Sequence, residues 1–316
     1  KPPCARSIVL RSWIDRLQHA APPLPLAGLV FGRERIGFVL LRREGDTLSV
    51  MQARETLLDR PLDPTDRGSV QPVAQVVKTL TAEIAGRYLP LHVSLADSLC
   101  RMTVLELESA PADRTGQRSL AAFRLEREVG RPPAGIDCQL LGQDDGKSLL
   151  LAASLDEDWA GYLGDILTHA GLVPWSLGAN LLCQFNRFHE RLTTNASGGA
   201  LLALSPDAWS VLIWDAQGRP RVIRSRVRQP GADDFETVAG ELERLILAYV
   251  HGASGREIAA IHVLAGDPAM ALMLDRRLKT PSLRIDPLEG CRWENGAEPP
   301  SDTIASMALA AALTPA

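Results

Sequence analysis

The sequence predicts an α/β protein built from two similar halves, each a mixed sheet with flanking helices, with a small α+β subdomain inserted in the first half. Two observations indicate the duplication: three strand-like segments follow one another from Leu26, and a second such series begins at Ala200. In both halves an amphipathic helix and a further strand come next. We therefore expect an N-terminal arm at 1–25, a first half at 26–199 with its insertion at about 100–151, and a shortened second half at 200–316.

Composition is that of an ordinary globular protein. The chain has 316 residues, of which 46% are hydrophobic and 23% charged, and its net charge is −4. This length can form two domains or one large α/β domain, and the negative charge gives no broad attraction to nucleic acid. Five widely spaced cysteines form neither a metal clip nor a disulfide framework, which favours a reducing cytoplasm.

Membrane contact is expected only through a partner, because no apolar run reaches the roughly 18 residues that span a bilayer. The sequence begins at Lys1 rather than at methionine, which is compatible with a missing upstream segment.

The N-terminal arm contains one candidate helix, Ser7 to Ala20. Three prolines follow it and end it. Its apolar residues fall on one stripe, namely Leu10, Trp13, Ile14 and Leu17. The helix could dock on a partner or membrane surface, but we favour packing on its own domain.

The first half starts with an antiparallel meander, for which we expect strands at Leu26 to Phe31, Arg35 to Arg42 and Thr47 to Ala53. A helix running through Arg87 and a strand at Leu91 to Leu95 follow. The helical spacing is carried by Val73, Val76, Val77, Leu80 and Ile84. This order of elements is typical of a ribonuclease-H-like half-domain.

The inserted subdomain should contain a strand at Met102 to Leu107, a helix at Gln117 to Val129 and a hairpin that turns at Asp144-Asp145-Gly146. A strand at Ser148 to Ala153 leads to a capping box, Ser154 to Glu157, which predicts the start of the next helix. We expect that helix to end at Gly171.

The second half repeats the opening of the first. A meander from Ala200 turns near Gly218 and returns through Arg221 to Arg228. The predicted elements after it are a helix at Asp234 to His251, a strand at Ala260 to Leu264, a turn at 265–268 and a closing helix at Thr303 to Leu313.

Several segments, in order, resemble the PilM-type proteins of type IV pilus assembly and the cytoplasmic domain of the GspL proteins of type II secretion. The likeness extends over roughly residues 26 to 313, and the segments that carry it most clearly lie in the centre and toward the end of the chain. They are Leu120 to Glu128 with Pro132, Ile136 to Leu141, Leu149 to Ala153, Tyr162-Leu163, Ala170-Gly171-Leu172-Val173-Pro174, Val263 to Gly266 and Met307 to Ala310. The resemblance implies an actin-like fold of two ribonuclease-H-like halves around a nucleotide cleft.

Three departures imply that nucleotide hydrolysis is lost. Val30 and Ala203 stand where this family carries the phosphate-loop aspartates, and Ser205-Pro206 replaces glycine and a small flexible residue. Proline also lacks the N–H that a phosphate would bind. About 16 residues separate Gly218 from the next helix, too few for a helical lid. GspL-type and MshI-like relatives share this reduced form.

Vestiges of a nucleotide site would be Gly32, Ser205 and Gly266. Glu34 and Asp207 lie in the two hairpin turns and are weak candidates for a metal role, because acidic residues are common in solvated turns. The histidines lack metal-ligand spacing and no serine stands in a G-x-S-x-G elbow. We therefore expect no metal, no catalytic residue and no cofactor, with weak ATP binding as the exception.

PilM-type proteins bind a short cytoplasmic tail of a PilN-type membrane partner, with Asn-Leu-Leu-Pro-like residues in the peptide. If a similar groove is kept, its walls should come from one helix and two strands of the first half. The candidate residues are Val39, Leu41, Val50, Val73, Val77 and Leu80, which could equally be plain core.

A basic strand in the second half is a further candidate surface. Alternation should place Arg224, Arg226 and Arg228 on one face of the sheet. They would either protect an edge strand from aggregation or bind an acidic segment of a partner.

The sequence thus favours a non-catalytic actin-like scaffold of a pilus or secretion platform. We expect it to be cytoplasmic, peripheral to the inner membrane through its partner, and able to form a dimer. Two alternatives stay open: an ATP-binding PilM-like switch without efficient hydrolysis, and a degenerate sugar-kinase-like enzyme.

Overall fold

The computed structural model describes most of the chain from Leu26 to Leu313. The described residues are 26–44, 47–86, 89–130, 133, 135–194, 197–205, 208–228, 235–252, 257–264, 268–278, 280–294 and 302–313. The predicted arm helix, Pro206, Asp207 and Gly266 lie outside them.

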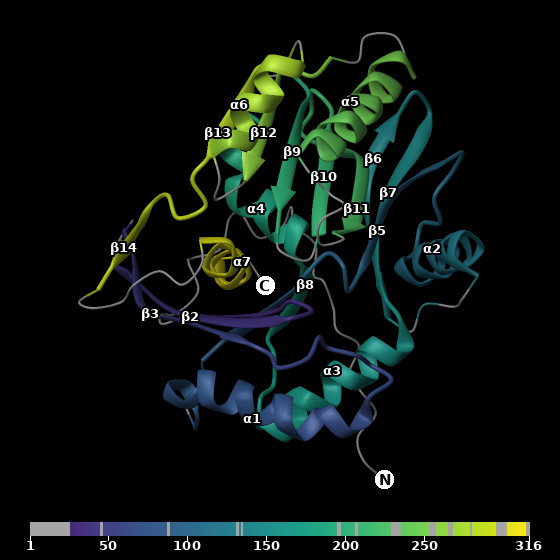
Figure 1. Ribbon diagram of the computed structural model, residues 1–316. Coiled ribbons are helices and arrows are strands. Elements are labelled where there is room, and N and C mark those ends of the chain that lie inside the picture. The colour runs from purple at the N-terminus through teal and green to yellow at the C-terminus, as the bar shows by residue number, and fades with distance from the viewer. Residues whose placement is uncertain are drawn as a thin grey trace.

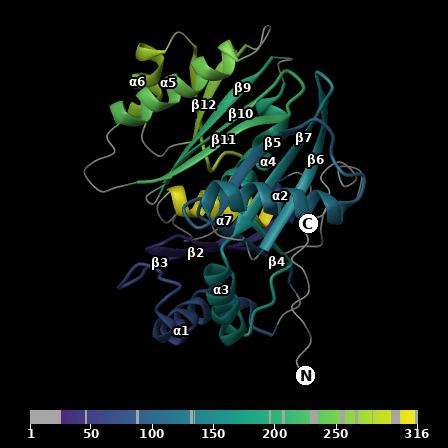
Figure 2. The same cartoon turned by 90° about the vertical axis from the view of Figure 1, so that its right-hand side faces the viewer.

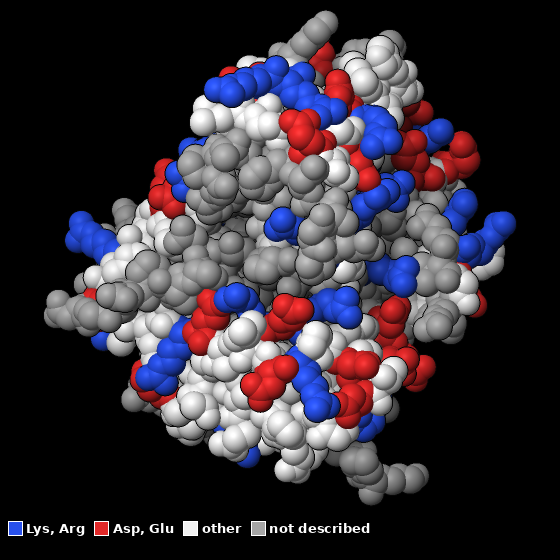
Figure 3. All heavy atoms as spheres, in the orientation of Figure 1, with Lys and Arg blue, Asp and Glu red and all other residues white. Residues whose placement is uncertain are grey.

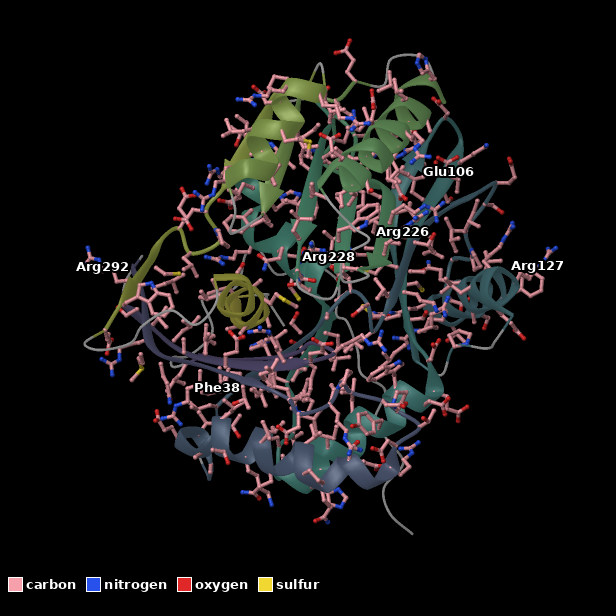
Figure 4. All side chains as sticks on the ribbon, in the orientation of Figure 1. Phe38, Glu106, Arg127, Arg226, Arg228 and Arg292 are labelled. Carbon is pink, nitrogen blue, oxygen red and sulfur yellow. The ribbon has the colours of Figure 1, made fainter. Side chains whose placement is uncertain are left out.

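The first half is built on a six-stranded mixed sheet in the order β14-β3-β2-β1-β4-β8 (Figure 1). Its own strands are β1 (Leu26–Phe31), β2 (Arg35–Glu44), β3 (Thr47–Leu57), β4 (Leu91–Leu95) and β8 (Ser176–Ala179). The meander is antiparallel, and β4 runs parallel to β1. Helices α1 (Val70–Leu80) and α3 (Glu157–Ala170) cover one face. Figure 4 places Phe38 between this sheet and α1.

The second half repeats this plan with a five-stranded sheet in the order β11-β10-β9-β12-β13. Its elements are β9 (Gly199–Leu204), β10 (Ala208–Trp214), β11 (Pro220–Val227), α5 (Phe235–His251), β12 (Ala260–Leu264), α6 (Pro268–Arg277) and β13 (Ser282–Ile285). In both sheets the first strand of the half lies between its antiparallel hairpin partner and a parallel strand. The predicted duplication and α/β class are therefore confirmed.

The inserted subdomain is a three-stranded sheet in the order β5-β7-β6 with one helix packed against it. The elements are β5 (Arg101–Leu107), α2 (Arg114–Val129), β6 (Gly135–Asp144) and β7 (Lys147–Leu155). Asp113 caps α2 by accepting a bond from the Gly116 amide, and Gly130 ends it in the left-handed conformation. Figure 2 shows this subdomain beside the second sheet.

Two helices exchange partners between the halves. Helix α4 (Asn180–Leu192) follows the first sheet but packs on the second, where Leu181, Phe185 and Leu192 join the core with Trp214. Helix α7 (Asp302–Leu313) follows the second sheet, yet it lies on the first sheet, and Met307 and Leu309 belong to that core (Figures 1 and 2). The Gln184 amide of α4 donates to Ser306 of α7 over 2.8 Å, which links the two exchanged helices.

Close approach of α7 to β1 explains Gly28. A Cβ atom at Gly28 would overlap the carbonyl of Ala308, lying 2.9 Å from its carbon, and would stand 3.1 Å from the Ala312 Cβ. Only a residue without a side chain fits under the helix backbone at this point.

Some element boundaries differ from those predicted. The capping-box helix starts two residues later than expected, with Asp156 as its N-cap residue and without a side-chain cap bond, whereas Gly171 ends it in the left-handed conformation as predicted. Helix α1 stops at Leu80 and a short 3-10 turn at Ala82–Ile84 follows, so the prediction of one helix through Arg87 was wrong. The sequence analysis did not predict α4, α6, β8, β13 and β14 (Cys291–Trp293). Strand β14 pairs with β3.

Candidate functional site

The two hairpins that would hold a nucleotide are closed by their own hydrogen bonds. In the first, the Gly32 amide donates to the Arg35 carbonyl over 2.8 Å. In the second, the Ser205 amide donates to the Ala208 carbonyl over 2.8 Å, and the Ser205 hydroxyl accepts from the Ala208 amide over 3.0 Å. The serine side chain thus caps its own turn. Gly32 is not among the glycines with a left-handed backbone, so its turn does not require glycine for that reason.

The position taken by Val30 is filled by apolar packing. Val30 is fully buried in the core of the first half. It lies two residues after Gly28 on β1 and therefore on the same face, which α7 covers. A carboxylate here would be buried against the exchanged helix without water around it.

Ala203, the corresponding residue of the second hairpin, has an equally apolar environment. Its core cluster contains Leu181 from α4, Leu264 from β12 and Leu151 from the inserted subdomain. Ala203 is itself 6% exposed. Residues from three other parts of the chain thus share the apolar core to which Ala203 belongs, at the position of the second phosphate-loop aspartate of a working site.

A buried carboxylate lies between the halves, at a residue that the sequence analysis did not predict. Asp97 follows β4 and accepts a hydrogen bond from the Leu181 amide, in the first turn of α4, over 2.9 Å. Burial raises the pKa of Asp97 to about 6, while hydrogen bonds from Leu181, Ser210 and Asn180 act in the opposite direction. Asp97 thus serves as the cap of α4, whose own N-cap residue, Ala179, has no side-chain bond.

In the described part of the chain, no group of three or more His, Cys, Asp or Glu residues could hold a metal ion. Glu34, the weak candidate in the first hairpin turn, is exposed to solvent. His92 is buried and His262 is half-buried, and burial lowers the pKa of each to about 4. These histidines are therefore neutral packing residues at physiological pH.

The basic strand β11 has two different faces. Arg221 is almost fully buried and contacts Asp144 of β6 over 2.5 Å and Glu106 of β5 over 3.0 Å. Arg219 contacts Asp215 over 2.8 Å and Asp144 over 3.3 Å. These ion pairs join the inserted subdomain to the second half, a role that the sequence reading did not assign.

The three arginines that the sequence singled out lie on the other face or just beyond the strand. Arg224 and Arg226 pair in register with Val211 and Trp209, whose side chains belong to the core beneath α5. Arg226 contacts Glu241 of α5 over 2.5 Å, and Arg228 donates to the Ser205 carbonyl over 3.2 Å. Figure 4 shows both side chains at β11. β11 is an edge strand, as the interpretation of these arginines as protection against aggregation requires.

The six proposed groove residues are core residues. Val39, Leu41, Val50 and Val77 are fully buried, and Val73 and Leu80 are 7% and 3% exposed. Val73 borders a groove of about 620 Å³ between the end of β3 and α1. The other five are buried, because the apolar stripe that predicts the helix and the strands also faces the core. The groove that borders Val73 therefore lies at the end of β3, beside α1.

This groove has an apolar floor and a mixed rim. Its apolar lining includes Leu57, which is 60% exposed, together with Leu62, Val73 and Val76. Tyr162 of α3 borders it, and its hydroxyl lies 2.6 Å from the Ser69 hydroxyl. The rim carries Asp59, Arg60 and Asp66. Its volume is in the range of sites that accept a short peptide segment or a small molecule.

The surface charge gives no second candidate on the face seen in Figure 3, where acidic and basic side chains alternate instead of forming one large patch. No described helix is long and apolar enough to span a membrane.

The duplicated sheets, the inserted subdomain and the exchanged helices define an actin-like ATPase fold. No family model matches the chain, and no curated protein matches it. Among solved structures, a chain of the PilM-PilN type IV pilus biogenesis complex is similar, with a TM-score of 0.70, 15% identity, and coverage of 92% of this chain and 98% of that one.

Two further solved structures are similar to the chain. A Bacteroides thetaiotaomicron protein with an actin-like ATPase fold has a TM-score of 0.53 at 10% identity and covers 90% of this chain and 95% of its own. The cytoplasmic domain of EpsL, an inner-membrane component of the type II secretion system of Vibrio cholerae, has a TM-score of 0.49 at 12% identity, over 91% and 94% of the two chains. The first two likenesses establish the fold.

Proposed function

We propose that this chain is a non-catalytic scaffold with an actin-like fold, which binds the cytoplasmic tail of a membrane partner in a type IV pilus or type II secretion platform. One observation carries the proposal. Both positions at which a working hairpin needs an aspartate are apolar and buried, and other elements cover them.

Loss of hydrolysis follows from the chemistry of phosphoryl transfer. The reaction depends on positioned Mg²⁺ ions and on a group that orients the attacking water. Val30 and Ala203 can supply neither. The weak alternatives do not replace them, because Glu34 is exposed in its turn and Asp97 is engaged with the first turn of α4.

The proposed partner site is the groove between the end of β3 and α1, in the first half at 26–199. Leu57 offers an exposed apolar surface beside the floor formed by Leu62 and Val76. Cytoplasmic segments next to a membrane span are rich in Lys and Arg. Asp59 and Asp66 at the rim suit a tail that combines leucine-type residues with such basic residues. The chain would then be cytoplasmic and peripheral to the inner membrane.

Nucleotide binding is tested first by isothermal titration calorimetry of the full chain with Mg²⁺-ATP, beside AMP-PNP. We expect no detectable heat. Micromolar binding of either nucleotide would instead support the ATP-binding switch, and phosphorylation of a sugar would support the degenerate kinase.

Partner binding is tested with a short synthetic peptide that contains Asn-Leu-Leu-Pro flanked by lysines. We expect Leu57→Ser to weaken its binding roughly tenfold or more, since a buried leucine contributes about 1.5–3 kcal/mol. The matched control is Leu272→Ser on α6, because Leu272 is similarly exposed at 61% but lies in the other half. Equal affinities for the two variants would exclude this groove, and absence of peptide binding by the unaltered chain would remove the scaffold proposal.

A further inference from the structure

An exposed apolar patch lies in the segment that joins α3 to β8. Val173 is 87% exposed and Trp175 is 66% exposed. Leu172, between the end of α3 and these two residues, is partly buried against the first core. Residues 170–177 carry no charge. A tryptophan and a valine left open together, without charges in their own segment, are typical of a surface that another segment covers.

The patch lies beside the point where the N-terminal segment enters the fold. The Trp175 amide donates to the Leu91 carbonyl over 2.7 Å, and the Ala27 amide donates to the Pro90 carbonyl over 3.3 Å. In the order β1-β4-β8, β1 is therefore two strands from Trp175, or roughly 10 Å at the usual strand spacing. The residues before Leu26 begin within this distance of the patch.

The N-terminal segment has the composition that the patch requires. From the sequence we expect a helix at 7–20, whose stripe of Leu10, Trp13, Ile14 and Leu17 contains no charge, while Arg11 and Arg16 fall outside the stripe. The five residues 21–25 can span roughly 15 Å when extended, enough to bring the stripe over the patch. A tether this short also gives a local concentration in the millimolar range, so this helix competes well with any free partner.

We propose that residues 7–20 form an amphipathic helix that docks on the patch formed by Leu172, Val173 and Trp175. The arm then completes the outer surface of the first half and is not a free membrane or partner anchor. This docking needs neither a nucleotide nor a partner tail, so it is independent of the proposed scaffold function.

Hydrogen exchange of the full chain tests the dock. In the unaltered protein, the amides of residues 8–20 should exchange at least tenfold more slowly than those of a free peptide of the same sequence. Trp175→Ser and Trp13→Ser, one change on each side of the contact, should each remove most of this protection. Leu272→Ser is the control for an exposed apolar residue elsewhere and should leave it unchanged. Unaltered exchange of the amides of β4 would show that each variant is folded.

Several results would overturn the dock. Free exchange of residues 8–20 in the unaltered protein would do so, as would full protection in Trp175→Ser. Protection that rises with protein concentration would place the arm on a second copy of the chain. Protection that appears only with phosphatidylglycerol vesicles would place it on a lipid surface.

Discussion

Replacing Gly28 by alanine tests whether α7 is packed on the first sheet as closely as the structure shows. The new Cβ would overlap the backbone of Ala308, and no side chain there can rotate away to make room. Overpacking a core typically costs about 1–3 kcal/mol. We expect a value near 3 kcal/mol, because the helix backbone must move.

Complete undocking of α7 would cost more than this shift. Met307 and Leu309 are both buried, and exposing each side chain would cost about 1.5–3 kcal/mol of stability. Exposure of the buried alanines of α7 would add to this cost. The helix should therefore slide and remain bound, and the midpoint of thermal unfolding should fall by roughly 6–12 °C, since a large domain loses about 2–4 °C per kcal/mol.

Differential scanning calorimetry and urea unfolding at neutral pH would measure both quantities. Gly164→Ala is the matched control, because Gly164 lies on the exposed side of α3 with no atom near its would-be Cβ. That change should be neutral or stabilise by up to about 1 kcal/mol. If Gly28→Ala unfolds within 0.5 kcal/mol of the unaltered protein, α7 does not approach β1 in this way.

Two further changes test the polar contacts between parts of the chain. Arg221→Met should destabilise by about 2–3 kcal/mol in urea unfolding, because it removes the buried cation that joins Glu106 to Asp144. Arg224→Gln, at an exposed position of the same strand, should change stability by less than 0.5 kcal/mol. Similar losses in both variants would contradict the assigned roles. Asp97 has a folded-state pKa of about 6, above the value of roughly 3.9 in an unfolded chain. The stability that its protonated form contributes is therefore fully present below about pH 4 and is lost as the pH rises through about 6. The free energy of unfolding of Asp97→Asn, relative to that of the unaltered protein, should therefore rise by about 2–3 kcal/mol between pH 4 and pH 7. A stability difference that stays constant with pH would refute the raised pKa.

Local patterns predicted the strands well, because their signals are contained within each strand. The limits of β1 and β4 match the predicted ones, and the Asp-Gly pair at 145–146 marks the turn between β6 and β7. Helix α4 has apolar residues at helical spacing, Leu181, Phe185, Phe188 and Leu192, so its periodic signal was present. Its cap was not readable, since Asp97 supplies it from 84 positions away.

The candidate site was harder to predict than the fold. The sequence identifies Val30 and Ala203 as apolar, but the elements that cover them arrive from distant parts of the chain. The groove prediction named core residues because a valine at a helical or alternating position signals burial, not access. Strand β14 has only three residues and pairs with β3 over a long separation, so no local pattern could reveal it.

The exchange of α4 and α7 affects the order in which the chain can complete its cores during synthesis. The first sheet leaves one face open until α7, whose twelve residues end at Leu313, has emerged from the ribosome. The second sheet, by contrast, finds α4 already made when its strands appear. The half that is translated first is therefore completed after the second, and nascent chains must hold the surface around Gly28 uncovered until α7 has been made.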